Sequence, residues 1–176
     1  MAMKMLDAGG APVLIDGIRT PDDNNPNGYY EFERVKGLEQ NRDTVWLADA
    51  RGKAVKIISF LLTWLPESYN YKLLFMRRDL TELIASQNAM LVRHGEAPTT
   101  TGDERLRELY EAHVDQVSTF VAKRPCFSTI AVAYQDVLRD PHLEAGRIRD
   151  FLGLDLDVQR MADVADPALY RNRVRA

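Results

Sequence analysis

Short apolar runs alternate with stretches of helical periodicity along this chain, and that alternation limits the possible fold more than any other feature. Four runs have the length and composition of buried strands: Pro12–Ile15, Ala54–Ile58, Lys72–Met76 and Thr129–Ala133. Each is nearly continuous in apolar residues, as strands covered on both faces are. Strands that alternate with helices predict an α/β fold, with a parallel sheet and helices on both of its faces.

Local signals mark the ends of the helices between these runs. Asp79 precedes a helical stripe and Glu82 follows three residues later, which is the spacing of a capping box. Asp140 and Pro141 predict a second helix start, and Gly153 predicts the end of that helix. These helix boundaries agree with the strand positions, so both patterns support the same fold class.

Length and composition narrow the class of protein. A chain of 176 residues fits one domain, taken as 1–176, and 45% hydrophobic residues exclude a disordered chain. The net charge of −3 disfavours a nucleic-acid binder. The single cysteine, Cys126, excludes an internal disulfide and favours a reducing, cytoplasmic compartment. No apolar run approaches the roughly 20 residues of a membrane span, and no residues have the spacing of metal ligands.

Polar residues follow the predicted strands, where a parallel sheet binds its ligands. They are Asp16, Ser59, Arg77, Arg78 and Gln135. Arg77 and Arg78 meet the start of a helix at Asp79, a combination that suits a phosphate or a sulfate. Ser86 follows Arg78 by two helical turns and could share the anion. The alternative is a solvated arginine pair, with Asp79 acting only as a helix cap.

The stretch from Lys53 to Gln87 resembles the middle of the sulfotransferase family. Members of that family have a strand, a Leu-Pro pair, a second strand and then Arg-Asn-Pro-x-Asp-x-x-x-Ser. Here Leu65-Pro66 precedes the run that ends at Arg77, and Arg78 and Ser86 take the positions of the family's Arg and Ser. The resemblance implies that Arg78 and Ser86, with Arg77 beside them, bind the 3′-phosphate of the sulfuryl donor 3′-phosphoadenosine 5′-phosphosulfate.

Further segments extend the resemblance over nearly the whole chain. Tyr134–Leu138, Asp140-Pro141 and Phe151–Leu154 are similar to the family's Tyr-Glu-Asp-Leu, Asp-Pro and Phe-Leu-Gly segments, and Asp16–Arg19 and Asn25–Glu31 resemble a bacterial branch. The resemblance implies the P-loop NTPase-like sulfotransferase fold. Basic residues near the end of the chain, Arg171, Arg173 and Arg175, would then add phosphate contacts; the alternative is a solvated tail.

One departure from the family concerns the start of the chain. The family begins with a strand and a Pro-Arg-Ser-Gly-Thr loop that holds the 5′-phosphosulfate, whereas Met1–Ala8 resembles the helix after that loop. No Gly-x-x-x-x-Gly-Lys-Ser/Thr motif occurs either. We therefore expect an N-terminally truncated chain, without the first strand and phosphate loop, and inactive or impaired. It should have a groove between apolar neighbours, and be less stable or pair with itself as a homodimer.

A second departure concerns the catalytic base. Many relatives carry Lys-Thr-His after the second strand, where this chain has Ile58-Ser59-Phe60. Other branches use a carboxylate, and the candidates here are Asp16, Asp22, Asp23, Glu31 and Glu33. Glu31 is favoured because the Asn-Pro-Asn-Gly loop before it could carry it into the cleft; the alternative is a solvated carboxylate at a helix start. His113, on the apolar stripe of a helix, is expected to be a satisfied core or boundary histidine.

The resemblance predicts transfer of a sulfuryl group from 3′-phosphoadenosine 5′-phosphosulfate to a hydroxyl or amine of a small-molecule or carbohydrate acceptor. A different class is a non-catalytic remnant of the same fold that binds a nucleotide or a partner protein. A third is another nucleotide-fold enzyme, such as a kinase relative, against which the absent Walker lysine counts.

Overall fold

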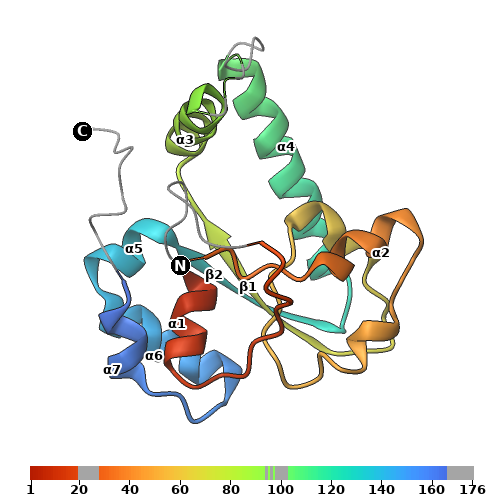
Figure 1. Ribbon diagram of the computed structural model, residues 1–176, viewed down its shortest axis with the longest axis vertical. Helices are drawn as coiled ribbons and strands as arrows, with labels where there is room; N and C mark the ends of the chain where they lie inside the picture. Colours follow the sequence, from red (N-terminus) through yellow and green to blue (C-terminus); the bar gives the residue numbers. More distant parts are fainter. Residues whose placement is uncertain (20–27, 94, 96, 98–102, 166–176) are drawn as a thin grey trace.

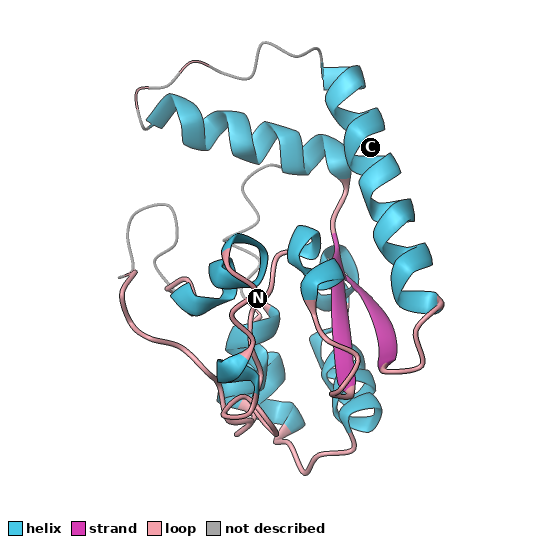
Figure 2. Cartoon of the chain, turned by 90° about the vertical axis from the view of Figure 1, so that its right-hand side faces the viewer, coloured by secondary structure: helices cyan, strands magenta, loops and turns pink. Residues whose placement is uncertain are grey.

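The computed structural model describes residues 1–19, 28–93, 95, 97 and 103–165, and contains a two-stranded parallel sheet. Strand β1 (Tyr71–Arg77) pairs with β2 (Phe127–Ala133) along its whole length. The strands lie side by side among the helices (Figure 2). The α-helices are α1 (Ala2–Ala8), α2 (Gly37–Gln40), α3 (Leu80–Arg93), α4 (Asp103–Ala122), α5 (Tyr134–Arg139), α6 (Pro141–Leu152) and α7 (Val158–Asp163). The described residues also form the 3₁₀ helices η1 (Glu33–Lys36), η2 (Val45–Leu47) and η3 (Ser59–Trp64).

The sheet is smaller than the sequence predicts. The runs at 72–76 and 129–133 form β1 and β2, but the runs at 12–15 and 54–58 form no strand. They meet in one parallel bridge, in which the Ala54 N–H donates to the Pro12 carbonyl at 2.8 Å and the Leu14 N–H donates to the Ala54 carbonyl at 2.9 Å. The physical reason is that a strand needs a neighbouring strand that pairs with its backbone N–H and C=O groups, and these two runs pair at one bridge only. After Ala54 the chain runs beside a pocket.

Side chains of β1 alternate between two hydrophobic cores, one on each face of the sheet. Leu74 and Met76 pack against the core built from α1, α5, α6 and α7. Leu73 and Phe75 pack against the core that contains η2, η3 and part of α4. The buried members of the first core include Met5, Leu6, Val132, Val137, Ala145, Ile148 and Met161, and those of the second include Leu38, Trp46, Leu61, Leu62, Val117 and Val121. Helical segments therefore cover both faces of the sheet, as expected, and Figure 1 shows the two groups on its opposite sides.

The predicted helix boundaries are confirmed at three places. The Asp79 carboxylate accepts the Glu82 N–H at 3.1 Å at the start of α3. At the start of α6, the Asp140 carboxylate accepts the Leu143 N–H at 3.0 Å, and Gly153 ends that helix with a φ of 64°. The position after α6 requires this left-handed conformation, which glycine adopts without strain.

Candidate functional site

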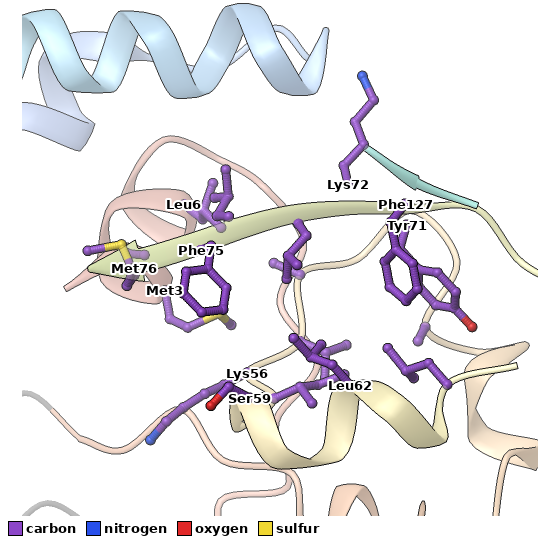
Figure 3. Close-up of a pocket in the computed structure, with 18 of the residues that line it drawn as sticks. Met3, Leu6, Lys56, Ser59, Leu62, Tyr71, Lys72, Phe75, Met76 and Phe127 are labelled. Carbon is purple, nitrogen blue, oxygen red and sulfur yellow. The ribbon is translucent and has the colours of Figure 1, made fainter. Parts of the chain in front are cut away.

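A pocket of about 1060 Å³ lies between the segment 54–57 and strand β1. Helix α1 contributes Met3 and Leu6 to its lining, and η3 contributes Ser59 and Leu62 (Figure 3). Tyr110, His113 and Val114 of α4 also line it. The pocket is thus bounded by both cores of the molecule and follows the edge of β1 opposite β2.

The edge of β1 that faces the pocket carries backbone groups without a strand partner. The Tyr71 N–H donates to the Cys126 carbonyl at 2.8 Å, which sets the register of the parallel ladder. In such a ladder alternate residues bond to the same neighbour, so Lys72, Leu74 and Met76 direct their backbone N–H and C=O groups away from β2. Among the described residues, no strand pairs with that edge.

Arg77 and Arg78 lie at the carboxyl end of β1, just before α3, and both line the pocket. The strand places this end at the edge of the sheet, and the Asp79 cap starts the helix immediately afterwards. Both residues therefore lie near the positive end of the α3 dipole, and the guanidinium of Arg78 lies beside Glu82 and Tyr134. The sequence predicted that both residues lie between the end of a strand and the start of a helix, and the structure places them there.

The Arg78 side chain, 26% exposed, is surrounded by residues from two helices. Its Nε lies 3.8 Å from the carboxylate of Glu82, whose side chain is only 1% exposed. Its guanidinium carbon lies 5.1 Å from the centre of the Tyr134 ring. The Gln135 amide donates to the Glu82 carboxylate at 3.4 Å. The sequence predicted Glu82 only as half of a capping box and not as part of this cluster, although its spacing of four residues from Arg78 was a signal for an ion pair.

Ser86 lies on α3, two turns after Arg78 and one turn after Glu82. It is half-buried and is not among the described residues that line the pocket. Residues spaced by four share one face of a helix, so Glu82 comes between Arg78 and Ser86 on that face. The expected grouping of Arg78 with Ser86 therefore includes a carboxylate that the sequence analysis did not assign to it.

Glu31, the favoured candidate for the base, is held by cations. Its carboxylate accepts a hydrogen bond from Lys56 Nζ at 3.1 Å, and Arg19 Nη1 lies 3.5 Å away. Lys56 also donates to the Tyr29 carbonyl at 3.1 Å and lines the pocket, whereas Glu31 is not among the described residues of that lining. The structure thus connects Glu31 to the pocket wall through Lys56.

The other candidate carboxylates differ in their surroundings. Asp16 accepts backbone N–H groups of Glu33 and Ile18, which hold the pKa of its carboxyl below the ordinary value. Because a lowered pKa weakens a base, Asp16 is less suited to accept a proton. Glu33 pairs with Lys36 at 2.8 Å. The remaining candidates, Asp22 and Asp23, lie outside the described residues, as do Arg171, Arg173 and Arg175.

Ser59 and His113 form a pair at the pocket wall that joins η3 to α4. The Ser59 hydroxyl lies 2.8 Å from His113 Nε2, and the imidazole stacks on the Phe60 ring with the centroids 3.7 Å apart. Burial lowers the pKa of His113, which keeps the imidazole neutral at pH 7. The sequence predicted a satisfied histidine here, which agrees with this hydrogen bond. The sequence gave no signal that His113 also lines a pocket, because Ser59, its hydrogen-bond partner there, is 54 residues away.

The described residues contain neither a membrane-spanning helix nor a cluster of metal ligands. None of their helices combines the length and apolar character that crossing a membrane requires. No group of three or more histidine, cysteine or carboxylate side chains in this part of the chain could hold a metal ion.

Comparison with known proteins identifies a family. A model described as the sulfotransferase family matches residues 29–158, which is more than half of the chain. No curated protein and no solved structure matches the chain. The matched range contains β1, β2, the arginine pair and the Ser59–His113 pair.

Proposed function

This chain belongs to the sulfotransferase family, and on that premise we propose that it moves a sulfuryl group from 3′-phosphoadenosine 5′-phosphosulfate to an acceptor. The acceptor is a hydroxyl or an amine on a small molecule or a carbohydrate. The observation that carries the proposal is the pair Arg77 and Arg78 at the carboxyl end of β1, where they line the pocket and precede α3.

This position suits the 3′-phosphate of the donor. Arginine presents several N–H donors in a planar group that matches the geometry of phosphate oxygens. The start of α3 adds backbone amides and the positive end of the helix dipole. We assign Arg78 to the phosphate, with Arg77 beside it and Ser86 further along α3 as a hydroxyl donor. Arg171 is assigned an additional phosphate contact on the resemblance alone.

The reaction also needs a group that takes a proton from the acceptor. The acceptor oxygen or nitrogen bonds to sulfur while the bond from sulfur to the donor's phosphate oxygen breaks, and the acceptor's proton passes to a base. Among the carboxylates, we propose Glu31 because Lys56 holds it beside the pocket wall. His113 is the alternative, since its neutral imidazole lines the pocket itself.

The residues present fit one half of the donor better than the other. The arginine pair and the helix start suit the 3′-phosphate, but the sequence contains no loop of the phosphate-binding type for the 5′-phosphosulfate. Negative charge develops around that group during transfer, and removing one donor of hydrogen bonds to such charge costs about 10²–10³ in rate. We therefore propose that residues 1–176 alone bind the nucleotide and transfer sulfate slowly.

The test measures transfer of radioactive sulfate from labelled donor to a panel of hydroxyl and amine acceptors. Residues 1–176 are compared with a version that carries a strand and a Pro-Arg-Ser-Gly-Thr loop in front of Met1. We expect the extended version to be at least about 10²-fold faster, because the loop supplies hydrogen-bond donors to the charge that develops on the sulfuryl group. In that version Glu31→Gln should slow transfer by about 10²–10⁴, the usual contribution of a general base.

Other outcomes of this assay have distinct meanings. Fast transfer by residues 1–176 alone would show that the chain already has the donors that we find lacking. No transfer by either version, combined with binding of the nucleotide, would favour a protein of this fold that binds nucleotide without catalysis. If His113→Asn removed transfer and Glu31→Gln did not, the base would be His113.

A further inference from the structure

Glu82 is a buried carboxylate beside the candidate phosphate-binding arginine. The residue is 2% exposed, although it lies in the first turn of α3, four residues after the pocket-lining Arg78. A buried carboxylate is costly unless a cation or hydrogen-bond donors compensate it. Its partners therefore indicate why the chain places a charge there.

The contacts of Glu82 point away from a capping role. Asp79 caps α3 by accepting the Glu82 N–H, so the backbone of Glu82 belongs to the cap. The carboxylate of Glu82 instead contacts Arg78 Nε at 3.8 Å and accepts the Gln135 amide at 3.4 Å. The carboxylate thus joins α3 to the start of α5, which follows β2 directly.

Two contacts bear on the orientation of the Arg78 guanidinium. Glu82 contacts the guanidinium at its Nε, and the Tyr134 ring lies under its carbon at 5.1 Å. A guanidinium has five N–H donors in one plane, so a carboxylate at Nε and an anion at the terminal nitrogens meet different edges of the group. Holding one edge and one face of the plane reduces the number of orientations that an anion must select from.

We propose that Glu82 is a positioning residue that, with Tyr134 and Gln135, holds the Arg78 guanidinium in the orientation that binds the donor's 3′-phosphate. This inference rests on the proposed function and deepens it. It makes the preference for a 3′-phosphorylated nucleotide depend on a residue that carries a negative charge. It also gives a function to Tyr134 and to Gln135, two residues that follow strand β2 directly.

Electrostatics and positioning predict opposite signs for the removal of this charge. If Glu82 acts only through its charge, Glu82→Gln removes a repulsion and strengthens the binding of a phosphate. If Glu82 positions Arg78, the same substitution releases the guanidinium and weakens that binding. The sign of the change therefore separates the two roles without reference to its size.

The experiment measures the dissociation constants of 3′-phosphoadenosine 5′-phosphate and of adenosine 5′-phosphate by calorimetry. We expect residues 1–176 to prefer the 3′-phosphorylated nucleotide by at least about tenfold, the scale of a charge-assisted hydrogen bond. Glu82→Gln should reduce this preference several-fold and leave the affinity for adenosine 5′-phosphate unchanged. Tyr134→Leu, which keeps both charges, should reduce the preference in the same direction.

The matched control is Glu144→Gln. Glu144 is also a buried carboxylate, 3% exposed, but it pairs with Arg147 within α6 and is not among the described residues of the pocket lining. This substitution should lower the melting temperature, because it removes one charge of a buried ion pair. It should not change the nucleotide preference. It shows what destabilisation alone does to binding.

Two results would overturn the inference, and they are distinguishable. If the unsubstituted chain binds both nucleotides equally, the proposed function fails and the positioning role fails with it. If the unsubstituted chain prefers the 3′-phosphorylated nucleotide while Glu82→Gln keeps or increases that preference, only the positioning role is wrong. Should Glu82→Gln not fold, Tyr134→Leu decides the question with the same two nucleotides.

Discussion

The two edges of strand β1 have opposite structural roles. One edge pairs with β2 over the full strand, from Tyr71 opposite Phe127 to Arg77 opposite Ala133. The other edge faces a pocket of about 1060 Å³, and the segment 54–57 lies on the far side of that pocket. The paired edge joins β1 to β2, whose side chains belong to both cores. The open edge leaves space beside the arginine pair at the end of the strand.

The difference shows how one strand can serve both stability and binding. Side chains of β1 reach both cores regardless of which edge is paired, because side chains and backbone groups of a strand point in perpendicular directions. The backbone N–H and C=O groups of the open edge have no strand partner among the described residues. Stability should therefore depend on residues near the paired edge, and binding should depend on residues around the open edge.

The largest expected effect is a difference in stability between two valine substitutions, one on each side of β1. Val132, in β2, is completely buried, whereas Val55 lines the pocket and is half-buried. Val132→Ala should lower the free energy of unfolding by about 2–3 kcal/mol, since it loses buried methyl groups and leaves a cavity. Val55→Ala should lower it by about 1 kcal/mol or less, because the pocket is already open there.

Urea denaturation of both variants, with a check that the slope of the transition is unchanged, measures these free energies. Equal losses for the two substitutions would contradict the comparison, because they would mean that the pocket side is as tightly packed as the paired side.

A smaller effect should appear in the exchange of backbone amide hydrogens. The amides of Leu73 and Phe75 bond to β2, whereas those of Leu74 and Met76 point toward the pocket. We expect the pocket-facing amides to exchange at least about tenfold faster, which corresponds to the net contribution of one backbone hydrogen bond. Nuclear magnetic resonance of the exchanging amides distinguishes these neighbouring residues.

The same measurement tests pairing with a second copy of the chain. If two copies joined through the open edges, the amides of Leu74 and Met76 would become protected as the protein concentration rises. Protection that is equal on both edges and independent of concentration would contradict the assignment of the open edge.

Local signals in the sequence predicted much of the fold. Asp79, Asp140 and Gly153 mark helix ends because each acts on backbone groups within a few residues, and the structure confirms all three. The runs that became β1 and β2 were predicted almost to their ends. Pro12–Ile15 and Ala54–Ile58 were not strands, because pairing depends on a neighbour that a local pattern does not contain.

The candidate site was predictable only in part, for a similar reason. The position of Arg77 and Arg78 follows from a strand that leads into a helix, which is a local relation. The contact of Gln135 with Glu82, and that of Ser59 with His113, join residues 53 and 54 positions apart. No periodicity connects such residues, so the environment of Arg78 and the pocket position of His113 required the structure.

The most direct test of the central claim is the affinity of residues 1–176 for 3′-phosphoadenosine 5′-phosphate before and after Arg78→Ala. The account predicts that this substitution weakens binding by roughly 1.5–3 kcal/mol, the scale of a charge-assisted hydrogen bond to phosphate. Arg105→Ala serves as the control, since Arg105 pairs with Glu108 on the exposed surface of α4, and it should leave the affinity unchanged. An affinity that Arg78→Ala leaves unchanged would contradict the account, because the end of β1 would then not bind the 3′-phosphate.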